Sequence, residues 1–342
     1  MTRETCPKPR QRLGSSKPKR RRRVTKRKFN AEAAEHQDVY ERITARIVEQ
    51  LEKGVRPWAQ PWKSGEGGFK RPLRHNGIPY SGINVLMLWS VAFERGFESR
   101  IWMTFRQAVE LGAHVRQGEK GALVVYANRI TKTETTDAGV EEEREIPYLK
   151  GYVVFNTDQI EGLPEHYYAK PPPKFENNVQ RIDHAEKFFA STGADIRQRG
   201  GRAFYRQDAD FVQVPPIEAF PDAEEYYSTL AHEMTHWTKH PSRLERDFGR
   251  KSWGDEGYAI EELVAELGAA FICADLEIAP GAGEDVREDH ASYIASWLKV
   301  LKDDKRAIFS AASHAQRAAD YLHSFQKEPA PSPALPLPEA PS

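Results

Sequence analysis

The sequence contains little cysteine and no long apolar segment. Cys6 and Cys273 are its two cysteines among 342 residues, which excludes a disulfide framework and a zinc site made of cysteines. No apolar run approaches the roughly 18–20 residues that a membrane span requires, and the N-terminus lacks the apolar segment of a secretory signal. We therefore expect a soluble, cytoplasmic protein without a membrane partner, in which any metal ion is bound by histidines and carboxylates.

Net charge is also absent, but only because two oppositely charged parts cancel. The chain has 50 basic and 50 acidic residues. Residues 1–28 contain thirteen Lys or Arg and one acid, Glu4, so they carry about +12, while the remaining 37 basic and 49 acidic residues give about −12. Residues 1–34 have almost nothing to bury, which predicts a disordered basic tail able to bind nucleic acid without sequence preference.

Proline marks the other breaks in the chain. Three consecutive prolines lie within residues 170–176, where the missing backbone donors favour an extended linker. Residues 328–342 are rich in Pro, Ala and Ser and predict a second disordered tail. We expect one domain over residues 35–169 and another over residues 177–327.

Hydrophobic periodicity predicts an α+β fold class. The first domain should be α+β, with helices over 38–53, 84–93 and 104–111, the last capped by Thr104, and strands over 123–127 and 152–155. The second domain should be mainly helical with a small sheet. Its expected helices cover 177–192, 223–239, 259–275 and 290–325, and its expected strands cover 203–205 and 211–214.

The sequence HEMTH at residues 232–236 carries the clearest chemistry, because it is an HExxH motif inside an expected helix. Residues four apart share one face of a helix, so His232 and His236 can bind one Zn²⁺ while Glu233 acts as general base on water. Such a string also occurs by chance, and a catalytic zinc needs a third protein ligand.

A second expected helix, about 26 residues downstream, supplies that ligand. Its apolar stripe lies opposite a face that combines Glu262 and Glu266 with small alanines, which allows close approach to another helix. We expect Glu262 to be the third ligand, with Glu261 as the alternative. Glu266, one turn further on, should accept a hydrogen bond from the second ring nitrogen of a ligating histidine.

These residues also carry a resemblance to a known family. The strings YSTLA (227–231), RLER (243–246), EELVAEL (261–267) and HASYIASWL (290–298) resemble the zincin-like metallopeptidase domain of ArdC antirestriction proteins. The resemblance covers about residues 220–325 and implies a bacterial protein with a glutamate-zincin site. It implies metal binding more directly than proteolysis, so a zinc metallopeptidase activity is a hypothesis.

The first half resembles the N-terminal domain of the same family, which is shared with TraC-type conjugative primases and binds single-stranded DNA (ssDNA). The matching strings are GVRPW (54–58), PW (61–62), YSGINVL (80–86), WMTFRQA (102–108), VRQGEKG (115–121) and VFNTDQIEGL (154–163). Single strands are held by aromatic rings that stack on bases and by cations along the phosphates. The ssDNA-contacting residues that we expect are Trp58, Trp62, Lys63, Lys70, Arg71, Arg74, Tyr80, Asn84 and Arg116.

Together these features predict an ssDNA-binding antirestriction protein that protects incoming DNA during horizontal transfer and whose metallopeptidase domain acts on a DNA-bound or restriction protein. An alternative is a non-catalytic protein that coats ssDNA and keeps a structural or vestigial zinc. A nuclease fits less well, because two-metal nuclease sites need clustered acidic residues and the first half shows no such cluster beside its basic loops.

Overall fold

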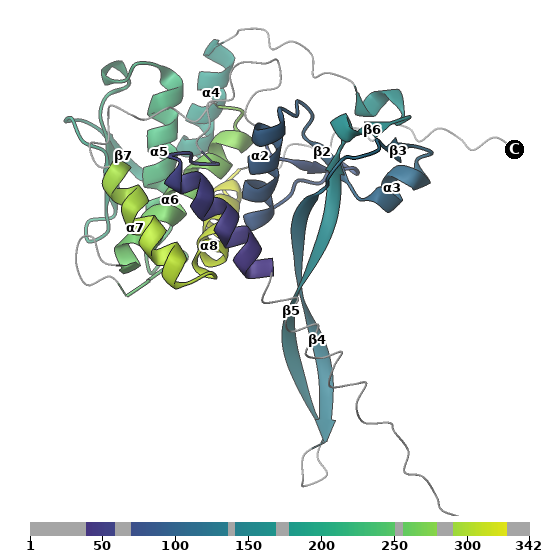
Figure 1. Cartoon of the computed structure of the whole chain (residues 1–342). Coiled ribbons are helices and arrows are strands. Elements are labelled where there is room, and N and C mark those ends of the chain that lie inside the picture. The colour runs from purple at the N-terminus through teal and green to yellow at the C-terminus, as the bar shows by residue number, and fades with distance from the viewer. Residues whose placement is uncertain are drawn as a thin grey trace, which may run out of the picture.

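The computed structural model describes residues 39–58, 70–135, 141–168, 178–249, 256–278 and 290–326. The two expected tails, the expected linker at 170–176, and Trp62 and Lys63 all lie outside these residues. The described chain forms a mainly helical body from which a β-hairpin projects as an arm (Figure 1). None of its described helices has the length and apolar composition of a membrane span.

The first half is α+β, as expected. Its helices are residues 39–52, α2 (Ile83–Arg95) and α3 (Phe105–Glu110). A four-stranded sheet has the order β1 (Leu73–Arg74), β2 (Ile101–Met103), β5 (Glu141–Asn156) and β4 (Ala122–Thr135), with only the β1–β2 pair parallel. Two short strands form an antiparallel pair, β3 (His114–Val115) and β6 (Ile160–Glu161). Thr104 caps α3 as expected.

The second half packs its helices around the expected motif. The helices are α4 (Asn178–Ala190), α5 (Ala223–Trp237), α6 (Glu256–Asp275), α7 (His290–Asp303) and α8 (Ala307–His323). A three-stranded sheet has the order β7 (Asp195–Gln198), β9 (Phe211–Val214) and β8 (Phe204–Arg206).

Two expectations about these elements were wrong. The helix expected over 290–325 is broken at residues 304–306, because the Asp304 carboxylate accepts the Arg306 N–H and the Lys305 carbonyl accepts from Thr44 Oγ1 at 2.7 Å. The local Asp304 bond and the distant Thr44 bond replace those that would continue the helix. The strands expected at 123–127 and 152–155 are also much longer, since they extend into the hairpin arm.

One hydrophobic core runs through both halves of the chain. Buried residues of the first helix and α2 belong to the same cluster as those of α5, α6, α7 and α8. Trp58 meets Trp297 with ring centroids 6.0 Å apart, and Tyr40 meets Phe309 at 4.6 Å. The two expected domains therefore pack as one body wherever the structure describes them, and their boundary at 170–176 stays a prediction.

Candidate metal centre

The HExxH motif lies in α5, the buried central helix of the second half. Asp222 caps this helix, because its carboxylate accepts the Glu225 N–H at 2.8 Å. His232 and His236 follow one turn apart, both buried, with ring centroids 4.8 Å apart. The helix thus presents two imidazoles together on one face, as their spacing predicts.

Helix α6 approaches α5 closely because Gly268 faces Thr235. A Cβ added at Gly268 would lie 2.5 Å from Thr235 Cγ2, which is closer than van der Waals contact allows. The missing side chain lets the helix backbones approach, so that the carboxylates of α6 reach the histidines of α5.

We expect Gly268→Ala to destabilise the fold although alanine favours helices. The added methyl overpacks the contact at a cost of about 1–3 kcal/mol, against a gain in helix propensity of at most about 1 kcal/mol. Urea denaturation would measure the difference in the free energy of unfolding. The double variant Gly268→Ala/Thr235→Ala should recover part of the loss; equal losses in both would contradict the packing explanation.

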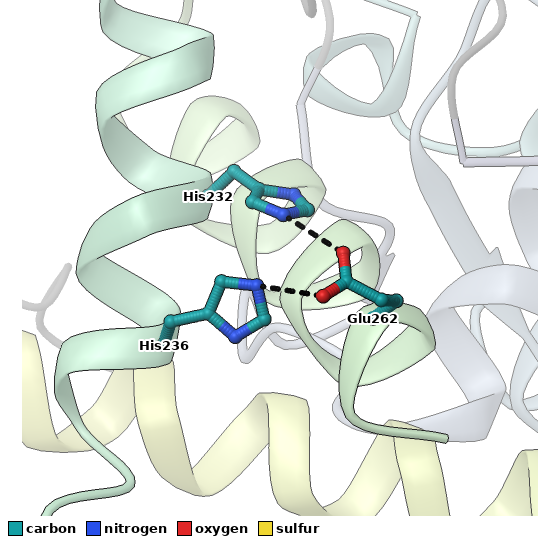
Figure 2. A group of neighbouring side chains, drawn as sticks. All are labelled: His232, His236 and Glu262. Atoms are coloured by element: carbon teal, nitrogen blue, oxygen red, sulfur yellow. Dashed lines mark ion pairs between the residues drawn. The ribbon is translucent and has the colours of Figure 1, made fainter. Parts of the chain in front are cut away.

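Glu262 on α6 faces both histidines (Figure 2). Its Oε2 lies 3.6 Å from His232 Nε2 and its Oε1 lies 3.5 Å from His236 Nε2. One ligand atom from each of the three residues lies within 4.8 Å of the others. This is the trio that the sequence analysis proposes as metal ligands.

Each histidine is held from behind by a second carboxylate of α6. His236 Nδ1 lies 2.9 Å from Glu261 Oε1, and His232 Nδ1 lies 3.6 Å from Glu266 Oε1. Both Nε2 atoms are therefore turned toward Glu262, which is how carboxylates orient histidine ligands around metal ions. Glu266 lies beside the second ring nitrogen of His232, and its expected hydrogen bond stays a prediction. Glu261 points to the far ring nitrogen of His236, so its geometry fits a supporting role better than the alternative role as third ligand.

Each supporting carboxylate in turn contacts an arginine. Arg246 binds Glu261 through two bonds of 2.8 and 2.9 Å and is itself buried. Arg56, from the first half of the chain, reaches Glu266 at 3.5 Å. In each case an arginine contacts a glutamate, which in turn lies beside a histidine of the motif. Arg246 lies in the loop that follows α5, and Arg56 comes from the other half of the protein. Sequence reasoning assigned neither arginine to the site.

Tyr258, which is also on α6, lies beside Glu262. The Tyr258 hydroxyl hydrogen-bonds Glu262 and lies 2.8 Å from the Tyr293 hydroxyl. Burial, together with the negative charge of Glu262, raises the pKa of the phenol well above its usual range. Tyr258 precedes Glu262 by four residues, so the sequence could have predicted that the two side chains share a helix face. Tyr226 and Tyr227 instead bond Gln198 and Glu186.

The charges of the site are strongly coupled. Burial alone would lower the pKa of His236, but the charge of Glu262 and the hydrogen bond to Glu261 raise it to about 9. Burial alone would raise the pKa of Glu261, but bonds from His236 and Arg246 lower it to about 2. An entering cation therefore has to displace a proton from His236.

Three of the residues expected to contact ssDNA are buried. Trp58 is only 1% exposed against Trp297, and Tyr80 is buried beside Arg74. Arg71 is also buried, and forms a two-bond ion pair with Asp275. These three residues stabilise the core and offer no open surface, which corrects their expected availability to a DNA strand.

The other expected ssDNA residues have mixed settings. The Asn84 side chain donates to the Val125 carbonyl at 2.8 Å and accepts the Val125 N–H at 2.7 Å, which ties α2 to β4. Lys70 pairs with Glu277 at 2.6 Å. Arg74 and Arg116 are exposed, and Arg116 also pairs with Glu119 at 2.9 Å.

Comparison with protein families matches both halves. Residues 37–155 match the N-terminal domain of anti-restriction factor ArdC, and residues 183–314 match a zincin-like metallopeptidase family. A protein of Sinorhizobium fredii, y4eC, is 40% identical over 296 residues, or 85% of this chain and 93% of the relative. A DNA primase TraC of Escherichia coli is 37% identical over 305 residues, which span 84% of this chain but only 27% of the primase.

Two solved structures are also similar. The metal-free antirestriction protein ArdC from plasmid R388 superimposes with a TM-score of 0.70 at 47% identity, over 84% of this chain and 97% of the other. Its Mn(II)-bound structure gives a TM-score of 0.66 at 45% identity, with the same coverage.

Proposed function

Because this chain belongs to the ArdC antirestriction family, we propose that it binds ssDNA and protects incoming DNA through a zinc-dependent peptidase site. The observation that carries this proposal is the convergence of two imidazoles and one carboxylate on a common point. The Mn(II)-bound state of the R388 protein supports a metal site in this fold.

The donor atoms fit a divalent ion. A tetrahedral ion with bonds of about 2.1 Å holds its ligand atoms about 3.4 Å apart. Each Nε2 atom lies 3.5 or 3.6 Å from its nearer Glu262 oxygen, close to that value, and one ligand atom from each of the three residues lies within 4.8 Å of the others. Two histidines and one glutamate are also the ligand set of zinc peptidases that keep one coordination position open. Zinc is therefore our proposed ion.

The side chains around the proposed ion have different roles in our proposal. When bound, the ion supplies Lewis acidity that lowers the pKa of water from about 15.7 toward about 7. Glu233 would act as general base and take a proton from water at this site; its side chain is buried and receives no ion pair or hydrogen bond within the described residues. Glu261 and Glu266 orient the two imidazoles, and Tyr258 donates to Glu262 and so fixes the direction of that carboxylate.

We expect Glu233→Gln to lower peptide hydrolysis by about 10²- to 10⁴-fold, the usual contribution of a general base, while metal content stays unchanged. Labelled casein and purified restriction enzymes are suitable substrates, each assayed with and without a 40-nucleotide ssDNA. Elemental analysis of the same samples would show which metal is bound. Equal cleavage by the zinc-loaded wild type and Glu233→Gln would remove the peptidase proposal.

An antirestriction assay in cells separates the proposal from the coating alternative. Transfer of unmodified DNA into a restricting host should lose its protection in Glu233→Gln if hydrolysis is required. Protection that survives this substitution would favour occlusion by ssDNA coating. Metal-dependent cleavage of labelled ssDNA by the wild type would instead indicate a nuclease.

A further inference from the structure

Two exposed tyrosines and a lysine lie together on one face of the hairpin arm. Tyr126 on β4 pairs directly with Lys150 on β5, and Val124 pairs with Tyr152. Because alternate residues of a strand share a face, Tyr126, Lys150 and Tyr152 are on the same side of the ribbon. We call this group the Tyr–Lys–Tyr face.

Both rings are exposed, unlike several other aromatic rings of the first half. Tyr126 is 50% exposed and Tyr152 is 39% exposed, whereas Trp58, Tyr80 and Trp102 are buried in the core. Lys150 is exposed, and its Nζ lies 5.1 Å from the centre of the Tyr152 ring. Solvent-exposed aromatic rings beside a cation are features with which proteins hold single strands, by stacking on bases and pairing with phosphate.

Charge in the rest of the molecule also favours this location. Residues 29–342 carry 37 basic and 49 acidic side chains, so most of the body repels a polyanion. The thirteen Lys and Arg of residues 1–28 precede the described chain, which begins at Val39. Val39 Cγ2 lies 3.5 Å from where Gly151 would carry a Cβ, against the other face of the same ribbon. The described chain thus begins against the face of the ribbon opposite Lys150 and Tyr152.

We propose that the Tyr–Lys–Tyr face is a binding surface for ssDNA, on which Tyr126 and Tyr152 stack on bases and Lys150 contacts a phosphate. This inference rests on the ssDNA binding proposed above and assigns it to residues that neither the sequence nor the family matches identify. The charge of the N-terminal segment adds attraction that is independent of base stacking.

Another exposed ring provides a matched control. Phe105 on α3 is 56% exposed and contacts Phe155 with ring centroids 6.5 Å apart. The adjacent Arg106 is neutralised by Glu110, with a bond of 2.7 Å. Phe105 therefore offers an open aromatic ring without a free cation beside it.

The test is binding of fluorescently labelled dT20 to the full-length protein, measured by anisotropy over a range of salt concentrations. Tyr126→Ala and Tyr152→Ala should each weaken binding by about 5- to 150-fold, while Phe105→Ala should leave it unchanged. Tyr126→Phe should retain binding, because the stacking ring remains. Lys150→Ala should reduce the slope of log affinity against log salt by about 0.7, the value for one single-strand phosphate contact.

The outcomes separate the surface from the function. If the wild type binds dT20 but the tyrosine variants bind as tightly, or if Phe105→Ala causes the same loss, the Tyr–Lys–Tyr face is wrong and ssDNA binding stands. If the wild type does not bind dT20, both fail. The other molecule that could bind this face is a second copy of the chain, and light scattering would detect it through the molar mass in solution. If the tyrosine substitutions dissociated an oligomer without changing the affinity for dT20, the face would be a contact between copies of the chain and the proposal would be wrong.

Discussion

Replacing Glu262 by alanine is expected to lower zinc affinity by at least about 100-fold. Residues that only support a ligand typically contribute 10- to 100-fold, and Glu262 is positioned to bind the ion itself, 3.5 and 3.6 Å from the two Nε2 atoms. The loss should exceed that of Glu261→Ala, which removes only the support of His236. Competition with a chromogenic chelator would measure both affinities.

Glu256→Ala is the matched control for the metal measurement. Glu256 lies on the same helix, but its side chain is exposed and near Lys299, so zinc affinity should not change. The ligand assignment would be overturned if Glu261→Ala removed the metal and Glu262→Ala did not. Loss of zinc in all three variants would point to a general disturbance of α6.

Replacing Arg71 by alanine is expected to lower the free energy of unfolding by about 1.5–3 kcal/mol, because Asp275 and Gln316 lose a charged hydrogen-bond partner while His323 remains 3.0 Å from Asp275. Arg71 makes bonds of 2.7 and 2.9 Å to Asp275 and one of 2.6 Å to Gln316, so it joins the first half of the chain to α6 and α8. Urea denaturation would measure the loss. In native buffer, affinity for dT20 should remain near the wild-type value.

Lys70→Ala is the neighbouring control. Lys70 pairs with Glu277, whose side chain is 45% exposed, so the substitution should cost about 0–1 kcal/mol. If Arg71→Ala instead lost ssDNA binding with unchanged stability, the expectation from sequence would be right and the core assignment wrong.

The metal centre was largely predictable because its pattern is local. His232 and His236 share a helix face through their spacing of four, and Glu262 stands out on a helix whose opposite face is apolar. The difference between Glu261 and Glu262 was harder to predict, since adjacent residues point about 100° apart and only the placement of α6 against α5 decides which one faces both Nε2 atoms.

The positions of the residues expected to contact ssDNA were harder to predict, because two roles share one composition. Arginine beside tryptophan and tyrosine is typical of a nucleic-acid surface, but the same residues also suit a buried contact between two helical layers. Trp58 and Arg71 belong to that contact. Pairing between segments more than 200 residues apart leaves no periodic signal in the sequence, so the shared core could not be read from it either.

The shared core constrains how genes for such proteins can recombine. Recombination at a breakpoint between residues 168 and 178 would join halves of different ancestry across a large apolar contact, and would also replace Arg56 beneath Glu266. A hybrid of this kind has to regain complementary packing before either half can work. We therefore expect the two halves to be inherited as one cassette, transferred whole into longer proteins such as the primases.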